Sequence, residues 1–237
     1  MSDKKVTKYL AYALGEILLV VIGILIALSI NNWNQGNQQQ KELKGYLEKI
    51  AANMKQDIAL AKDYKARREA ENQLCIQAFN SLQEDEPDLT LILAAIGIVQ
   101  EFYFIANKSG FEALKTSGYI GKLKNQKLDS LLTQYYFIMD KLEREEISYN
   151  TFIENMEATW LANHSILPVM REIDPRTMVI KDSVAFSKRL EENRDVFLAQ
   201  PVEAVIVRGA AETMPQFYYQ QLIEIGDAFI EEVEKMK

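Results

Sequence analysis

The longest run of apolar residues lies near the N-terminus, between Tyr9 and Trp33. It reads YLAYALGEILLVVIGILIALSINNW. As an α-helix, Tyr9 to Ile30 would extend roughly 33 Å, which matches a hydrocarbon core of about 30 Å. The pattern therefore predicts a transmembrane helix over residues 9–33, with Trp33 as an aromatic anchor at the membrane interface.

Glu16 interrupts this apolar run. A charged carboxylate within a span costs about 2.5–3.5 kcal/mol on insertion scales, whereas each Leu, Ile or Val contributes roughly −0.3 to −0.6 kcal/mol. The apolar residues from Ile17 to Ile30 can therefore outweigh one glutamate. Glu16 is expected to be an intramembrane polar residue, either structural or a proton relay.

The charges that flank the span predict its orientation. Lys4, Lys5 and Lys8 precede it, whereas residues 31–40 carry no charge. The positive-inside rule then makes residues 1–8 a cytoplasmic tail and residues 37–237 a periplasmic domain of an inner-membrane protein.

A cleaved signal peptide is the alternative interpretation of the same stretch. Ala27-Leu28-Ser29 has the small-x-small form of a cleavage site. The apolar run is longer than an ordinary signal-peptide core, and Glu16 would be unusual there. We therefore expect a retained anchor in contact with membrane lipid.

Small residues recur along the predicted span at multiples of four: Ala11, Gly15, Gly23 and Ala27. Small side chains at this spacing let two helices approach closely in a membrane. Glu16 lies about 100° around the helix from Gly15, at the edge of this small-residue stripe. The stripe predicts a homo-oligomer that associates through the transmembrane helix.

The N-terminal stretch also resembles the signature of an uncharacterised family of bacterial single-span membrane-anchored proteins, a family of unknown function. The shared features are Lys8-Tyr9, Gly15-Glu16, Val20-Val21-Ile22-Gly23 and Asn31-Asn32-Trp33-Asn34. The close match covers KYLAYALGEILLVVIGILIALSINNWN, and a looser, helix-rich similarity covers the rest. The resemblance implies a membrane location and a helical architecture but no activity.

The chain after the span has the periodicity of helices. Over residues 37–83, apolar residues step by three and four, and the span can continue into this helix with at most a local break near residues 34–37. The apolar positions are Leu43, Tyr46, Leu47, Ile50, Met54, Ile58 and Ala61.

Further helices are predicted along the rest of the chain. A short helix after Pro87 covers residues 89–99, and another, capped by Ser109, ends at Gly118. A long helix runs from Asn125 to about residue 163, with Ile147 on its apolar stripe. Residues 182–194 form a helix capped by Asp182, and residues 178–180 are a loop.

A last helix is expected over residues 201–236, with a kink at Pro215 and with Phe217 facing inward. Together these elements predict an all-α fold. An N-terminal transmembrane helix is followed by an antiparallel helical bundle of three long helices plus short helices.

Composition limits the possible partners and chemistry. The chain has 237 residues and a net charge of −7, which becomes −8 without residues 1–36, so the domain has no bulk attraction for nucleic acid. Cys75 is the only cysteine, so it has no intramolecular disulfide partner, and it is expected to be buried.

No catalytic, cofactor-binding or metal-binding motif is recognisable. His164 is the only histidine and is expected to lie at a helix end. The acidic pairs 145–146, 191–192 and 231–232 are expected to face solvent. Aromatic triplets at residues 102–104, 135–137 and 217–219 are expected to belong to the core rather than to a ligand pocket.

These features predict a non-enzymatic interaction or assembly component at the inner membrane. Two alternatives remain. One is a periplasmic ligand-sensing module, with a pocket at the aromatic triplets. The other is an oligomeric ion or proton pathway that uses Glu16.

Overall fold

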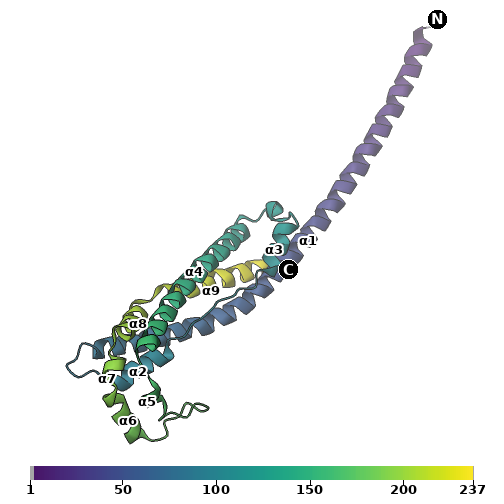
Figure 1. The fold of residues 1–237 in the computed structure, drawn as a ribbon. Coiled ribbons are helices and arrows are strands. Elements are labelled where there is room, and N and C mark those ends of the chain that lie inside the picture. The colour runs from purple at the N-terminus through teal and green to yellow at the C-terminus, as the bar shows by residue number, and fades with distance from the viewer. Residues whose placement is uncertain (1–2, 237) are drawn as a thin grey trace.

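One very long helix and a packed helical domain around its second half make up the fold (Figure 1). The computed structural model describes the backbone of residues 3–236 and the side chains of residues 14–236. Helix α1 (Asp3–Ser81) is continuous, without the local break that was allowed near residues 34–37. Its first half projects away from the domain, and its second half forms one side of it (Figure 1).

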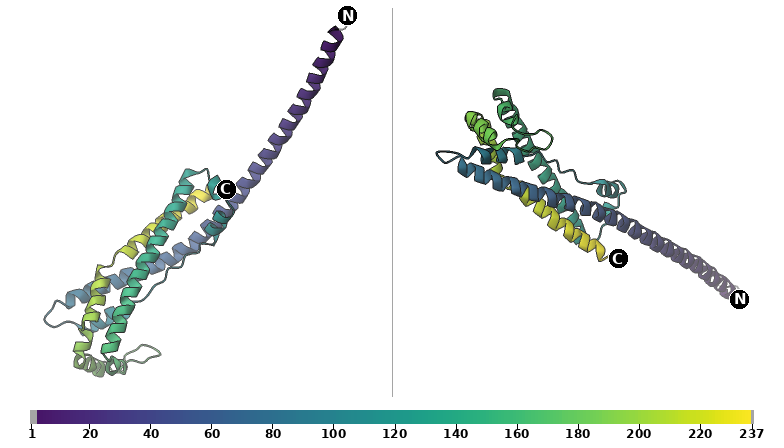
Figure 2. Two further views of the ribbon diagram at one scale, coloured as in Figure 1. Left: turned by 45° about the horizontal axis from the view of Figure 1, so that its top comes forward. Right: turned by 90° about the horizontal axis from the view of Figure 1, so that it is seen from below.

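The second half of α1 is amphipathic with the predicted register. Leu47, Ile50 and Met54 are fully buried, and Leu43, Ile58 and Ala61 are also in the core. The end of the domain where α1 enters is called proximal here, and the end near Ser81 distal. Figure 2 shows the C-terminus near the proximal end, where Lys44 Nζ donates to the carbonyl of Met236 at 2.9 Å.

Helix α2 (Leu89–Ile98) packs against the distal part of α1. Its cap is Asp88, whose carboxylate accepts hydrogen bonds from the N–H groups of Thr90 and Leu91. Pro87 therefore precedes the cap and does not occupy the first helical turn, where a proline near a helix start is common. The chain then returns along the domain as an extended segment, residues 99–108, in which Phe102 and Phe104 are buried.

The return segment is held by side chains of α1. Asp57 Oδ1 accepts a hydrogen bond from the N–H of Asn107 at 2.9 Å, and Asn53 Oδ1 accepts from Gly110 N–H at 3.0 Å. Gly110 belongs to α3 (Ser109–Thr116), in which Ser109 is the first residue and not the predicted cap. Gly118, at φ 73°, ends this region as expected, and the short 3-10 helix η1 (Ile120–Lys122) follows.

Helix α4 (Gln126–Asn163) begins after Asn125, which caps it as predicted. It runs parallel to α1, because Asp57–Tyr135, Arg68–Glu146 and Glu71–Tyr149 are all hydrogen-bonded pairs 78 residues apart. The predicted antiparallel arrangement is therefore wrong for these two helices. The return segment carries the chain back to the proximal end before α4 starts.

The C-terminal region is antiparallel to α1 but consists of two helices, α8 (Gln200–Ala211) and α9 (Met214–Glu234). The prediction of one helix kinked at Pro215 is wrong, since Pro215 lies in the first turn of α9, where a missing N–H costs nothing. Asn72 Nδ2 donates to the carbonyls of Gly209, Ala210 and Glu212 and so satisfies the open end of α8.

Short helices close the distal end: α5 (Leu167–Met170), α6 (Ser183–Glu192) and α7 (Arg194–Phe197). Asp182 caps α6 as predicted, but that helix ends before Asn193. Residues 178–180 are a loop, with an isolated antiparallel bridge between Ile173 and Ile180.

Two large hydrophobic clusters form the core, one at the proximal and one at the distal end. Trp160 and Phe197 belong to the distal cluster, and Tyr135 and Leu222 to the proximal one. Four predicted core positions are wrong, because their side chains are more than half exposed: Tyr103, Phe137, Ile147 and Phe217.

Candidate functional site

The apolar part of α1 has no packing partner in the domain. All side chains from Leu14 to Ile30 are exposed, and Leu19 retains 74% of its surface. Within the described residues, this is the one helix that is long and apolar enough to cross a membrane. A helix of this kind near the N-terminus could serve as a membrane anchor or as a signal sequence.

The small-residue stripe lies on this free part of the helix. A Cβ atom added at Gly15 or Gly23 would meet nothing within 4 Å, and Ala27 is exposed. The side chain of Ala11 lies outside the described residues. Glu16 is exposed and lies about 20° around the helix from Gly23, and Trp33 is 69% exposed at the end of the apolar segment. Of these residues, those from Gly15 onward do not contribute to the packing of the domain.

A second polar site lies inside the domain and was not predicted. We call it the buried ion network; its members come from α1, α4 and α9 and are Arg68, Glu71, Glu146, Tyr149, Asn150 and Tyr219. The side chains of Arg68 and Glu146 form an ion pair, and each is almost fully buried.

Arg68 is the centre of the network. Its Nη1 donates to Glu71 Oε2 at 2.9 Å and to the carbonyl of Gln100 at 3.1 Å. Its Nη2 donates to Glu146 and, at 3.2 Å, to Asn150 Oδ1. The guanidinium also lies 4.4 Å from the centroid of the Phe102 ring. Arg68 thus joins α1 to α4 and to the return segment.

The remaining members complete these connections. Tyr149 donates to Glu71, and Tyr219 Oη donates to Glu146 Oε1 at 2.7 Å, which brings in α9. Asn150 pairs with the backbone of Phe102, donating to its carbonyl at 2.7 Å and accepting from its N–H at 3.3 Å. Buried polar groups that are fully paired in this way favour one arrangement of the helices over its alternatives.

For both Glu71 and Arg68, burial and the neighbouring charges shift the pKa in opposite directions. Burial raises the pKa of Glu71, although the charge of Arg68 and a hydrogen bond from Tyr149 oppose this shift. Burial would lower the pKa of Arg68, but the hydrogen bond and charge of Glu146 outweigh it and the pKa is raised. Burial, followed by the adjacent carboxylates, raises the pKa values of the Tyr149 and Tyr219 hydroxyls. Arg68 is therefore a permanent cation, and both tyrosines act as donors.

The expectation that Glu146 faces solvent is wrong, since the residue is only 2% exposed. A signal for the network was present in the apolar stripe of α1. That stripe passes from Ala61 to Cys75 in helical steps, and Arg68 and Glu71 lie on the same face between them. Charged residues within a buried stripe need partners, and Glu146 continues the corresponding stripe of α4 after Leu142.

Cys75 and His164 have local roles. Cys75 is fully buried as expected, and burial raises the pKa of its thiol to about 12, which makes the thiol unreactive at neutral pH. It faces Gly209, where an added Cβ would approach Cys75 Sγ to 2.5 Å, so the glycine allows α8 to pack against α1. His164 is at the C-terminal end of α4. Between residues 14 and 236, no three His, Cys, Asp or Glu side chains group as a metal site.

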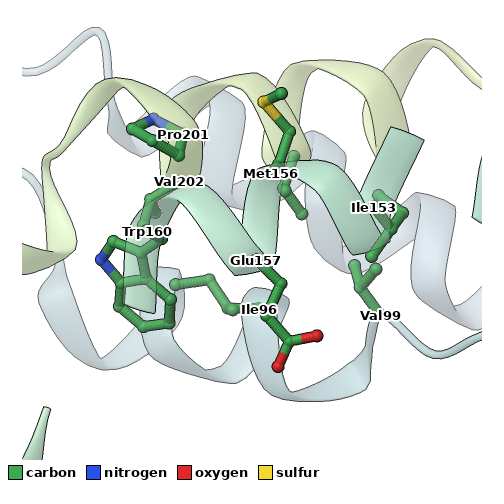
Figure 3. A pocket seen from close by; sticks show the side chains of 9 residues that line it. Ile96, Val99, Ile153, Met156, Glu157, Trp160, Pro201 and Val202 are labelled. Atoms are coloured by element: carbon green, nitrogen blue, oxygen red, sulfur yellow. The ribbon is translucent and has the colours of Figure 1, made fainter. Parts of the chain in front are cut away.

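Most of the aromatic triplet residues pack in the core. Phe104 meets Tyr219 edge to face at 5.7 Å between ring centroids, and Phe111 stacks on Tyr136 at 3.8 Å. A small cavity lies elsewhere, between α2, α4 and α8, with a volume of about 80 Å³ (Figure 3). Its lining residues are Ile96, Val99, Ile153, Met156, Glu157, Trp160, Pro201, Val202 and Val205.

Comparison with known proteins gives one match. The model of a family described as "Family of unknown function (DUF6090)" matches residues 16–156. This region runs from Glu16 through the return segment and most of α4, and it includes every member of the buried ion network except Tyr219. No curated protein and no solved structure matches the chain. Because the match covers more than half of the sequence, the chain belongs to this family of unknown function, DUF6090.

Proposed function

We propose that this protein is a single-span membrane component whose helical domain serves interaction or assembly and not catalysis. The N-terminus lies in the cytoplasm, residues 9–33 cross the inner membrane of a bacterium, and the domain is periplasmic. The lysines before the apolar segment support this orientation.

One observation carries the proposal: the exposed apolar helix is continuous with a folded domain that does not cover it. Leu14 to Ile30 are exposed, while the same helix is fully buried at Leu47 and Ile50. At roughly 25 cal/mol per Å² of apolar surface, leaving so many Leu, Ile and Val side chains in water is unfavourable. A lipid bilayer is the environment that would remove them from water.

Self-association is the second part of the proposal. Gly15 and Gly23 leave open space on the helix, and no element of the domain fills it. Close approach of a second helix at these positions would gain van der Waals contact in lipid. It would also shield Glu16 from the hydrocarbon, since that residue lies on the same face of the helix as Gly23.

Disulfide crosslinking of the full chain in membranes tests the assembly. In a Cys75→Ala background, Leu19→Cys places a thiol in the middle of the small-residue stripe, whereas Ile17→Cys places one on roughly the opposite face. We expect a crosslinked dimer with Leu19→Cys and none with Ile17→Cys. Equal crosslinking of both variants, or of neither, would refute association through the stripe.

A proton pathway through Glu16 is the second candidate function, favoured by the position of this carboxylate within the apolar segment. This candidate predicts that Glu16→Gln abolishes proton movement across the membrane while the crosslinked dimer persists. The assembly proposal predicts that function and dimer are lost or kept together.

A further inference from the structure

The cavity between α2, α4 and α8 has a wall that is apolar on three sides. Ile96 and Val99 come from the end of α2, Ile153 and Met156 from α4, and Val205 from α8. Figure 3 shows Trp160 and Pro201 at one end of this space and Val99 at the other. A cavity lined in this way favours an apolar group over water.

The wall is fixed in place by neighbouring contacts. Trp160 Nε1 donates to the carbonyl of Val196 at 2.8 Å, and its ring packs edge to face on Phe197 at 5.9 Å. Val202 is 2% exposed and lies in the first turn of α8. A ligand therefore enters a preformed space, which reduces the entropy lost on binding.

Glu157 gives the cavity a charged opening. Its side chain lines the cavity beside Ile96 (Figure 3) and is exposed to solvent. No basic residue lines the space. Between residues 14 and 236, no ion pair or side-chain hydrogen bond uses the carboxylate of the exposed Glu157 side chain. The opening is therefore negative and offers a free acceptor next to an apolar interior.

We propose that this cavity binds a small organic ammonium ion. The alkyl part fills the space between Val99 and Trp160, and the ammonium group pairs with Glu157 at the opening. One water molecule needs about 10–15 Å³ of such space, so a cavity of about 80 Å³ accepts a small molecule of roughly five to eight heavy atoms. An alkyl carboxylate of the same size is excluded by repulsion from Glu157. The site is independent of the membrane anchor and of self-association.

Fluorescence of Trp160 reports on binding to the full-length protein in detergent. The chain has two tryptophans, so Trp33→Phe leaves Trp160 as the single reporter. The probe is isoamylamine, which is protonated at neutral pH like a lysine side chain, and isoamyl alcohol is its neutral counterpart. We expect saturation by the amine with a Kd on the order of millimolar, and about tenfold weaker binding of the alcohol.

Variants separate the charged opening from the apolar space. Glu157→Gln should reduce the affinity for the amine to that for the alcohol, whereas Glu143→Gln, on the same helix but away from the cavity, should leave it unchanged. Val99→Phe should fill the space and abolish binding of both probes without lowering the melting temperature. The proposal fails if amine and alcohol bind wild type equally, if Glu157→Gln keeps the preference for the amine, or if Val99→Phe still binds.

Discussion

At the scale of single residues, the buried ion network contains one more carboxylate than cation. Glu71 and Glu146 both face Arg68, and Tyr149 and Tyr219 each donate to one of the two carboxylates. The single positive charge of Arg68 can balance only one of the two carboxylates. The second negative charge is therefore buried without a countercharge of its own. Glu71 is the carboxylate whose pKa burial raises. The fold therefore shifts Glu71 toward its neutral form relative to the unfolded chain.

The sign of the resulting pH dependence follows from the direction of this shift. Because the folded pKa of Glu71 lies above its ordinary value of 4.5, the folded state holds the proton more tightly than the unfolded state. Its contribution to stability is then greatest below pH 4.5 and is lost as the pH rises through the folded pKa. Glu71→Gln should remove this loss, so denaturant unfolding measured from pH 4 to 7 should show a flatter profile. Exposed Glu69→Gln is the control and should keep the wild-type profile; identical profiles for both variants would contradict the assignment.

Glu16 is a residue for which hydrogen bonding and charge can be separated. In the proposed oligomer it lies on the same helix face as Gly23 and needs a partner for its carboxyl group. Glu16→Gln should preserve association of the span, because an amide can still form the hydrogen bond, whereas Glu16→Leu should weaken it. A membrane two-hybrid assay measures both variants beside Gly23→Ile, which should block close approach. Wild-type association in all of them would mean that the stripe has no role.

At the scale of helices, the junction between α8 and α9 depends on a single side chain of α1. The three carbonyls that Asn72 binds are at the end of α8, where the helix leaves them without intrahelical partners. Gln216 Nε2 adds a bond to the carbonyl of Glu212 at 3.1 Å and one to that of Arg68 at 3.3 Å. The break in the C-terminal helix is therefore stabilised from α1 and not only by Pro215.

Removal of the Asn72 side chain should destabilise the protein measurably. Asn72→Ala leaves the partly buried carbonyls without their donor, and we expect a loss of about 1–3 kcal/mol in the free energy of unfolding. The neighbouring exposed residue provides the control, because Gln73→Ala should change stability by less than about 0.5 kcal/mol. Circular dichroism of the full chain in detergent during denaturation measures both. A loss in Asn72→Ala no larger than in Gln73→Ala would show that the junction does not depend on this cap.

Helix positions could be predicted from the sequence, but their directions could not. Asn125 and Asp182 are local capping signals, and the apolar period of α1 is a local property, so the corresponding helices were found with nearly correct bounds. The parallel direction of α4 depends on the return segment, which is held by Asn53, Asp57 and Asn150 through contacts distant in sequence. No periodicity encodes such contacts.

The network was missed for a related reason. Arg and Glu on a helix are most often solvated, and only the position of Arg68 between Ala61 and Cys75 distinguishes it from the exposed charges around it. Its partner Glu146 comes from another helix, so the pairing is a property of the assembled domain. The cavity, too, is formed only when α2, α4 and α8 meet.

At the scale of the whole molecule, the domain extends away from the apolar segment in one direction. The C-terminus returns to the proximal end, where Lys44 contacts Met236, so both the apolar segment and the C-terminus lie far from the distal tip (Figure 1). In the proposed orientation, the C-terminus is periplasmic and close to the membrane surface.

This placement predicts the outcome of a topology experiment. Alkaline phosphatase fused after the last residue should be active, and a fluorescent reporter that folds only in the cytoplasm should be dark, because the lysines before the span keep the N-terminus inside. Replacing Lys4, Lys5 and Lys8 by glutamine weakens that signal and should lower phosphatase activity. Strong cytoplasmic fluorescence of the wild-type fusion would reverse the orientation.

In the proposed membrane arrangement, the continuity of α1 makes the protein a lever with its pivot in the bilayer. From Trp33 to Ser81 the helix extends about 72 Å, and it has no hinge in the described chain. Transmembrane helices commonly tilt by about 20°, and the tilt changes when bilayer thickness changes. A change of that size in the span would carry the distal tip, with the cavity at Trp160, sideways by about 25 Å. The thickness of the membrane would thus be converted into the position of a site far from its surface.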